Sequence, residues 1–471
     1  MISLLLASHA VLQANSTEVT VYNGGYGFVK DVRELDLKAD VQPVVIDDVA
    51  EKIDATSVGF KCLSDPGSFS VLEQNYRYDL VSPEAILQKS VGKRIRFTRT
   101  VGGKKESVEG VLLSSPTAVV YNGDGANYQY NGLVIRTDDG RILLSPNGEI
   151  DVLQMPEGLI SKPSLLWQVD SAKDQSAKVE LSYLTEGIKW SANYVMTLGK
   201  SNVGDLQGWV TLDNQSGYNF RDATLKLLAG DVHRTERRYT RGTVFSGRSG
   251  INTINGSPMV EEGLFEYHLY TLQRPATVLN NQTKQLGLLE GTDIPMQKVI
   301  RVDSYENDPR ANATGETQDF AGSVHLLFTN DKKSHLGMPM PAGKIRFFQR
   351  DQKGSLQFIG EDAIKHTPRD EKLDLTVGNA FDVRASRKKI GYTKLSSRSA
   401  RIDYVMEVRN RKDSTANIHL YEHAMPFSYT DWKISKASDK FAKVDARSVL
   451  FALDLKPNEV KEVRFSVEAK W

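Results

Sequence analysis

Apolar and polar residues alternate along most of this chain, in short segments that end at Gly, Asn, Asp or Pro. A period of two residues is typical of a strand with one buried face, and the residues between the segments are those that favour turns. The clearest segments are residues 17–22, 179–184, 209–212, 223–228, 324–328, 402–408 and 460–467. The pattern predicts an all-β, mainly antiparallel protein built from β-sandwich domains.

Helical signals are scarce. The best begins at Ser82, a residue type that caps helix N-termini, with Pro83 in the first helical position. This predicts a helix of about two turns. The short strands that follow are closely spaced over residues 92–156 and separated by Gly-rich turns. Because closure removes exposed sheet edges, we expect these residues to form a small inserted β-barrel.

The length of 471 residues predicts roughly three domains. We expect an N-terminal β segment over residues 15–91 before the inserted barrel and a central β domain over residues 159–386 after it. Residues 234–262 are rich in Gly, Ser, Thr and Arg, which predicts a flexible loop. Residues 387–471 are expected to form an immunoglobulin-like sandwich around an inward-facing Trp432.

The first 14 residues contain a short apolar run followed by Ser8-His9-Ala10, and Ala14 offers a second small residue. Small residues at these positions suit cleavage of an export signal, although a positively charged start is missing. We therefore expect an exported protein, and a cytoplasmic one if this segment is not a signal. No later segment approaches the ~18 apolar residues of a membrane-spanning helix.

Composition narrows the classes of partner. The hydrophobic fraction of 40% and the charged fraction of 25% are those of a folded soluble domain. The net charge of +1 gives no overall field that attracts nucleic acid or an anionic membrane, so we expect neither as a partner. Cys62 is the single cysteine, which excludes an internal disulfide and a thiolate metal cluster, and a buried inert thiol is expected there.

One motif matches the sequence pattern of a zinc site. Residues His419 to His423 match the H-x-x-E-H pattern, in which residues four apart share one face of a helix. Here the motif follows a strand pattern, and in a strand the two histidines stand roughly 13 Å apart, too far for one ion. We therefore expect no metal at this pair, and no cofactor fingerprint is found elsewhere.

Carboxylates also lie near histidines in several other segments. Such groups coordinate metals or transfer protons, but more often they cap turns or carry surface charge. The pairs are Asp231 with His233, Glu266 with His268, and His366 with Glu361, Asp362, Asp370 and Glu371. As a binding surface we select Glu361, Asp362 and His366, which are expected on a turn after a strand; the catalytic residues remain unknown.

Several longer motifs resemble one family. They lie at residues 21–25, 181–194, 208–232, 265–270, 337–343 and 358–368. Together they are similar to a bacterial family catalogued as domain of unknown function 4139, and the resemblance covers nearly the whole chain. It implies an exported or envelope-associated protein and brings no established activity, cofactor or catalytic residue.

Turn chemistry and core packing explain parts of these motifs without any function. Asn214 to Gly217 form a turn sequence, and Trp190 and Trp209 are expected to fill the gap between two sheets. The leading hypothesis is a non-enzymatic binding or interaction module whose partner is a protein or another envelope component. The rival is a hydrolase whose site is assembled from residues far apart in the sequence.

Overall fold

The computed structural model describes residues 16–101, 103–114, 117–122, 125–130, 132–234, 259–305, 311, 313–423 and 431–471. For 101, 117–122 and 125–130 it describes the backbone alone. The expected signal segment 1–14 and most of the expected loop 234–262 lie outside the described residues.

The all-β prediction is confirmed. All seven alternating segments lie within strands, and the predicted helix is α1 (Pro83–Lys89), whose cap Ser82 accepts a hydrogen bond from Ala85 N. The other helical elements of the described chain are two single turns, η1 (Ala55–Ser57) and η2 (Lys332–Ser334). None of the helices within the described ranges has the length and apolar character needed to cross a bilayer.

Three sheets build the central body, and their strands come from both sides of the small inserted unit. The largest runs β18 (Met259–Leu264), β19 (Tyr267–Leu272), β17 (Phe220–Ala229), β1 (Ser16–Tyr22), β2 (Tyr26–Leu37), β14 (Gln175–Glu186), β4 (Gly59–Cys62), with β20 (Ala276–Val278) beside β17. The second runs β21 (Gln282–Pro295), β16 (Val203–Asn214), β15 (Ile188–Leu198), β24 (Gly343–Arg350), β25 (Leu356–Ile364). The third runs β3 (Asp40–Ile46), β13 (Ser164–Ser171), β5 (Phe69–Arg77).

The inserted unit is an open sheet of five strands, so the expected closed barrel is wrong for the described residues. Its order is β11 (Ile142–Leu144), β10 (Val134–Thr137), β7 (Lys104–Ser114), β6 (Arg94–Val101), β12 (Glu149–Val152), and a separate hairpin joins β8 (Thr117–Asn122) to β9 (Gly125–Tyr130). The outer strands β11 and β12 have three and four residues. Short edge strands limit edge-to-edge pairing without closure. A small core that includes Ile95, Phe97 and Leu112 belongs to this unit alone.

The C-terminal unit is one sheet of nine strands that folds over on itself. Its order is β29 (Asp431–Ala437), β32 (Val460–Lys470), β27 (Ser399–Asn410), β26 (Lys372–Ser396), β23 (Thr317–Thr329), β22 (Gln297–Tyr305), β28 (Ala416–His423), β31 (Ser448–Leu455), β30 (Ala442–Lys443). Phe451 of β31 and Phe465 of β32 pack with ring centroids 5.6 Å apart, although their strands are far apart in the sheet order. Trp432 is half-buried against this core.

The boundary expected at residue 387 lies too late in the chain. The C-terminal core already includes Ile300 of β22 and Val383 of β26, while Leu326 of β23 and Leu375 of β26 belong to the central core. Long strands therefore run from one core into the other. The N-terminal residues are likewise part of the central body, because β1 pairs with β17 and β2 pairs with β14.

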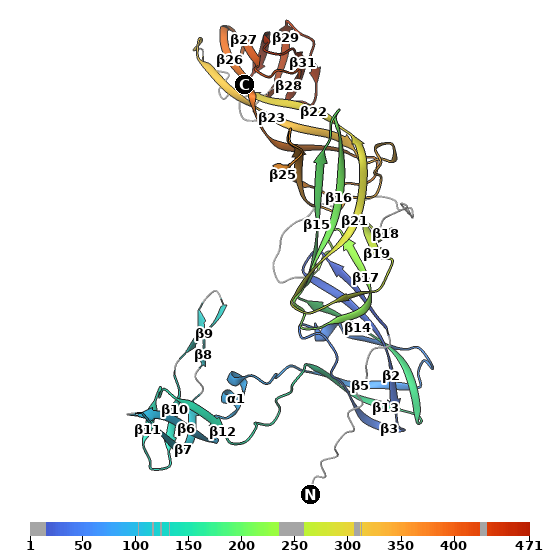
Figure 1. Cartoon of the computed structure of the whole chain (residues 1–471), viewed down its shortest axis with the longest axis vertical. Coiled ribbons are helices and arrows are strands. Elements are labelled where there is room, and N and C mark those ends of the chain that lie inside the picture. Colours follow the sequence, from blue (N-terminus) through green and yellow to red (C-terminus); the bar gives the residue numbers. More distant parts are fainter. Residues whose placement is uncertain are drawn as a thin grey trace.

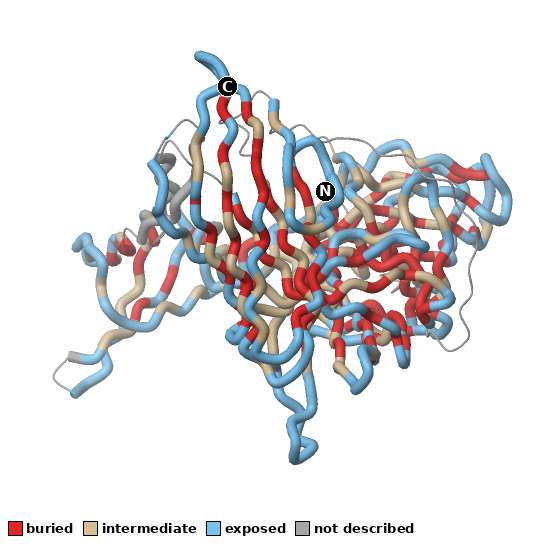
Figure 2. Tube along the Cα trace, turned by 90° about the horizontal axis from the view of Figure 1, so that it is seen from above, coloured by how far each residue is buried: buried red, intermediate tan, exposed pale blue. Residues whose placement is uncertain are grey.

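The units follow one another along an elongated, curved molecule (Figure 1). The C-terminal unit lies at one end, and the inserted unit stands away from the other end of the body on two connecting segments. Viewed from above, buried positions recur between exposed and half-buried positions along the strands (Figure 2). This is the alternation that the sequence displays, and it leaves one face of each strand available to solvent or to a partner.

Candidate functional site

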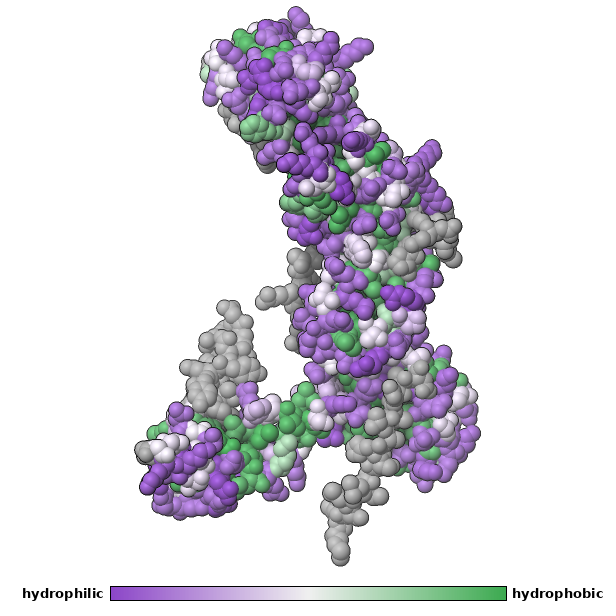
Figure 3. Space-filling model, viewed as in Figure 1, coloured by the Kyte–Doolittle hydropathy of each residue, from purple (hydrophilic) through white to green (hydrophobic). Residues whose placement is uncertain are grey.

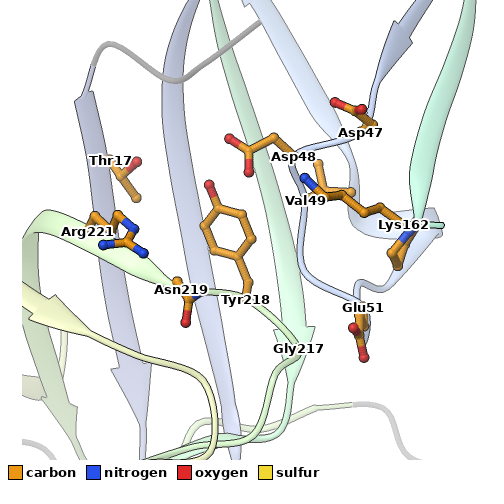
Figure 4. Close-up of a pocket in the computed structure, with 11 residues that line it drawn as sticks. Thr17, Asp47, Asp48, Val49, Glu51, Lys162, Gly217, Tyr218, Asn219 and Arg221 are labelled. Atoms are coloured by element: carbon orange, nitrogen blue, oxygen red, sulfur yellow. The ribbon is translucent and has the colours of Figure 1, made fainter. Parts of the chain in front are cut away.

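A polar pocket of about 350 Å³ lies in the central body, where four stretches of chain meet (Figure 4). They are β1, the residues after β3, the turn between β16 and β17 together with the start of β17, and the residues before β13. The side chains that give it its chemistry are Asp47, Asp48, Glu51, Lys162, Tyr218 and Arg221. The pocket is thus assembled from residues that are far apart in the sequence.

The turn between β16 and β17 is fixed by its own side chains. Asn214 accepts hydrogen bonds from the N–H and the hydroxyl of Ser216 and donates to the carbonyl oxygens of Tyr218 and Val278. Gly217 has a φ of +82°, the left-handed region that favours glycine. A Cβ there would lie 2.4 Å from the Cβ of Glu51, so this glycine also allows the two walls to approach.

Residues 47–51, which follow β3, form the acidic wall of the pocket, and three hydrogen bonds hold the backbone at this wall. Arg33 Nη2 donates to the carbonyl oxygen of Asp48 at 2.7 Å, and the Tyr76 hydroxyl donates to that of Glu51 at 2.8 Å. Lys52 N donates to the carbonyl oxygen of Ser216 at 3.2 Å, which ties this wall to the turn. The backbone that carries these polar side chains is therefore held on both sides of the pocket.

A buried ion pair lies close to the pocket. Arg33 Nη2 and Asp31 Oδ2 are 2.8 Å apart, and the two side chains are 1% and 0% exposed. Burial raises the pKa of Asp31, and the Arg33 guanidinium opposes this rise. Arg33 also approaches the Asp48 carboxylate, with Nη1 and Oδ2 3.8 Å apart. The guanidinium therefore links the buried carboxylate to the pocket wall.

Tyr218 is the central uncharged group of the pocket. Burial raises its pKa well above the usual value, and the carboxylates of Asp48 and Asp31 raise it further. Its hydroxyl points toward Asp48 (Figure 4). A phenol in this environment stays protonated at neutral pH. It therefore serves as a hydrogen-bond donor.

Four other side chains of the pocket are charged and make no ion pair within the described part of the chain. They are Asp47 and Glu51, which are acidic, and Lys162 and Arg221, which are basic. Arg221 lies with Thr17 on one side, while Asp47, Glu51 and Lys162 lie on the other, and Tyr218 and Asp48 lie between them (Figure 4). Glu51, Lys162 and Arg221 are exposed and Asp47 is half-buried, so the pocket presents both donors and acceptors to solvent.

The three residues selected from the sequence do not form one site. Glu361 and Asp362 lie inside β25, not on a turn after it, so their side chains point to opposite faces. Glu361 forms exposed ion pairs with Lys344 Nζ at 3.1 Å and Arg346 Nε at 3.4 Å. Asp362 accepts a hydrogen bond from Thr376 N at 2.7 Å, which fixes β26 beside β25.

His366 lies beyond the end of β25 and approaches residues of two other carboxylate–histidine pairs. Its Nδ1 accepts a hydrogen bond from Ala342 N at 3.2 Å. Desolvation lowers its pKa, the nearby Asp231 carboxylate raises it, and the nearby His268 lowers it. The structure therefore places His366 beside residues of two other motifs, Asp231 and His268, and His268 is itself 2.7 Å from the buried Glu261.

The H-x-x-E-H motif lies in β28, as the strand prediction requires. Two of its members have partners of their own: His423 Nε2 is 2.7 Å from Asp303, and Glu422 is 2.6 Å from Arg387 Nη2. Desolvation lowers the pKa of His419. Across the described ranges, no three His, Cys, Asp or Glu side chains converge in a way that would hold a metal ion.

Sequence reasoning missed the pocket because its members carry no motif of their own. Tyr218 and Arg221 lie in the segment 208–232 that carries the family resemblance, but turn chemistry was a sufficient explanation for that segment. The sequence feature that could have indicated the pocket is the run Asp47-Asp48, which directly follows a strand pattern. Comparison with family models gave no match, and comparison with curated proteins gave none either.

Proposed function

We propose that this chain is an exported protein of the cell envelope, a member of the family that it resembles, and that it acts as a binding or interaction module. The polar pocket between residues 47–51 and 217–221 carries the proposal. Its walls are held by hydrogen bonds, and four of its charged side chains have no ion-pair partner within the described residues. Preformed concave sites with convergent polar groups are the usual form of a ligand site.

A hydrolase is the second candidate, because Asp48, Lys162 and Tyr218 come together from distant parts of the sequence. The chemistry of Tyr218 favours binding instead. A nucleophilic side chain needs a lowered pKa or an adjacent base that removes its proton. The Tyr218 hydroxyl faces the Asp48 carboxylate, but burial and the neighbouring carboxylates raise its pKa, so the hydroxyl keeps its proton.

The test is capture of the partner in the protein's own cells. The full chain and its Arg221→Met variant are crosslinked to their surroundings in intact cells, purified and analysed by mass spectrometry. The control is Arg398→Met, an exposed arginine in the C-terminal unit. We expect one envelope component that wild type and control retain and the pocket variant loses. The same partners in all three samples, or turnover of a substrate that Arg221→Met abolishes, would contradict a binding role.

Export is tested separately. If the first residues are a signal, the native protein begins at Val11 or Asn15. N-terminal sequencing of protein from the periplasmic or extracellular fraction measures this directly. An intact Met1 on protein that is found in the cytosolic fraction would contradict export.

A further inference from the structure

The third sheet of the body ends in an open edge at β5, and we propose that a second copy of this chain pairs with that edge. The two copies of β5 run antiparallel, with a two-fold axis at Asn75, and join two sheets of three strands into one sheet of six. The inference goes beyond the proposed function, because no residue of β5 lines the pocket.

The outer side of β5 is free within the described chain. β5 pairs with β13 on one side, and no described residue outside β13 hydrogen-bonds to the backbone of residues 69–77. Residues 72–75 are exposed. An open strand edge presents a row of backbone N–H and C=O groups, which is a template for pairing with another strand. The backbone of β5 therefore supplies the hydrogen bonds of the interface.

The sequence of β5 lacks the features that protect other edges of this chain. Natural sheets protect their edges with very short strands, with Pro or with Lys. Here β11, β12 and β30 have four residues or fewer, β3 contains Pro43, and β29 contains Lys433 and Lys436. β5 has nine residues and contains neither Pro nor Lys. It is thus an edge that is suited to pairing.

The charges of β5 are complementary to those of a second β5. A two-fold axis between antiparallel strands is perpendicular to the sheet and keeps each side chain on its own face, so one residue lies on the axis. With Asn75 there, Glu73 of each copy stands opposite Arg77 of the other. Opposite charges at directly facing positions stabilise a strand pair. The interface therefore contains the same ion pair twice.

These charges determine the register and do not drive the pairing. Glu73 and Arg77 are exposed, so solvent satisfies both in a single chain. Moving the axis by two residues places two copies of Glu73, or two copies of Arg77, opposite each other, and facing like charges destabilise a strand pair. The backbone hydrogen bonds give affinity, and the charges select the register with Asn75 on the axis.

Exposed apolar side chains lie at both ends of the paired stretch. The register of β5 against β13 shifts between Gln168 and Val169, which leaves Leu72 as the extra residue, so the regular stretch is 73–77. Leu72 and Tyr78 flank this stretch and are 55% and 70% exposed. Each stands opposite the other across the axis. Pairing therefore also removes apolar surface from water.

The first test is sedimentation of the full chain over a range of concentrations. The mass of wild type should rise from one chain toward two. Glu73→Lys and Arg77→Glu should each weaken association by about tenfold or more, because like charges then face each other. An equimolar mixture of the two variants should associate as wild type does, since each basic residue of one variant then faces a glutamate of the other.

Matched controls separate this interface from general effects of charge. Arg398→Glu and Asp413→Lys reverse exposed charges in the C-terminal unit and should associate as wild type does. Arg221→Met, the pocket variant, should also associate as wild type does, so a failure here is distinguishable from a failure of the proposed binding function. Circular dichroism confirms that each variant is folded.

The second test locates the axis by a cross-link. Opposite Cα atoms of an antiparallel pair are about 4.5–5.5 Å apart, within the range that a disulfide spans. Asn75→Cys should therefore form a disulfide between two chains under mild oxidation. Ser70→Cys, an exposed position of the same strand, places its two copies roughly 30 Å apart and should not. Wild type, whose single Cys62 is buried, controls for other cross-links. Electrophoresis without reductant measures the product.

Wild type that keeps the mass of one chain at every concentration would overturn the inference. Dimers that persist in Glu73→Lys and in Arg77→Glu would also overturn it, because another surface would then hold the copies together. A mixture of these variants that does not associate would contradict the facing of Glu73 and Arg77. Equal cross-linking of Asn75→Cys and Ser70→Cys would contradict the position of the axis.

Discussion

Arg33 connects the buried interior of the central body to the pocket wall. It pairs with Asp31 inside the protein and donates to the carbonyl oxygen of Asp48, and its second nitrogen faces the carboxylate of the same residue. Removing water from two charges costs free energy, which the attraction between them offsets only while both are present. The pair is thus a sensitive point of the fold.

Arg33→Met should lower the free energy of unfolding by about 3–5 kcal/mol, because it leaves the Asp31 carboxylate buried without its partner. The double variant Asp31→Leu with Arg33→Met should recover most of this loss, since no charge then remains buried. Urea unfolding of the wild type, both single variants and the double variant measures the cycle. A loss below about 1 kcal/mol for Arg33→Met would show that solvent reaches this pair.

Asp303 makes the C-terminal unit sensitive to acid. Burial disfavours its charged form, but hydrogen bonds with His423 and Arg301 outweigh this and lower the pKa of Asp303 to about 2. A folded-state pKa below the unfolded value stabilises the protein above the unfolded pKa, and this contribution is lost as the pH falls through the folded pKa. The side chain is 41% exposed, so solvent screening reduces the contribution to about 1 kcal/mol.

Asp303→Asn should therefore lower the free energy of unfolding by about 1 kcal/mol at neutral pH. The difference from wild type should shrink as the pH falls from about 4 toward 2, because the wild-type carboxylate becomes protonated over that range. Urea unfolding at a series of pH values measures both. The control is Asp413→Asn, an exposed position. A deficit that is constant over the whole range would mean that Asp303 acts by packing and not by charge.

At the level of residues, the sequence predicted which positions alternate but not which face each alternation buries. Trp190 is buried as expected, whereas Trp209 is 38% exposed, because Val210 and Leu212 are the core positions of β16. Glu361 and Asp362 were expected together on a turn, but β25 extends through both, so their side chains point to opposite faces. Neighbouring residues of a strand point to opposite faces, and a one-residue change in register exchanges them.

The turn between β16 and β17 is the element that forms one side of the pocket, and two glycines allow its role to be measured. Gly217 and Gly354 have similar positive φ angles, +82° and +86°. They differ in their surroundings: a Cβ at Gly217 would lie 2.4 Å from Glu51, whereas a Cβ at Gly354 has nothing within 4 Å. The second glycine is thus a control for backbone strain alone.

Gly354→Ala should lower the free energy of unfolding by about 1 kcal/mol, the cost of a positive φ. Gly217→Ala should cost about 2–3 kcal/mol, because the new methyl group also displaces Glu51 and overpacks the contact between the two walls. Thermal and urea unfolding of both variants measure the difference. Equal losses for the two would show that the contact with Glu51 yields without cost, and that the pocket is less rigid than its hydrogen bonds imply.

The strands themselves were predictable, because each is encoded by its own alternation. Their pairing was not, because it joins distant segments. The pairing of β1 with β17 is parallel and links residues about two hundred positions apart, from Glu18 with Thr224 to Tyr22 with Leu228. β26 has 25 residues and contributes to two cores, which places the true joint between units inside a strand. A local pattern carries no information about such long-range contacts.

Over the whole molecule, the inserted unit is the part most separate from the rest. Its core includes Ile95 and Phe97 and shares no residue with the other two cores of the described chain. Two segments connect it to the body. These segments pair with each other through an isolated β-bridge between Leu80 and Ile160. Figure 3 shows apolar surface between the unit and the body. Tyr78, which is 70% exposed, belongs to the first of these segments.

Replacing residues 82–159 with a short Gly-Ser linker should leave the remaining units folded, because a unit with its own core contributes few contacts across its boundary. The ends to be joined are close, since Val81 N donates to the carbonyl oxygen of Ile160 at 3.0 Å. Loop-closure entropy changes slowly with loop length, so the linker adds little cost.

The measurement is calorimetric unfolding of the shortened chain and of wild type. The unfolding transition of the body should keep its midpoint, and only the heat absorbed by the inserted unit should disappear. Residues 82–159 expressed alone should supply that missing transition. A shortened chain that is insoluble or loses its cooperative transition would show that the unit stabilises the body through contacts at the apolar surface between them, and the two would then be one folding unit.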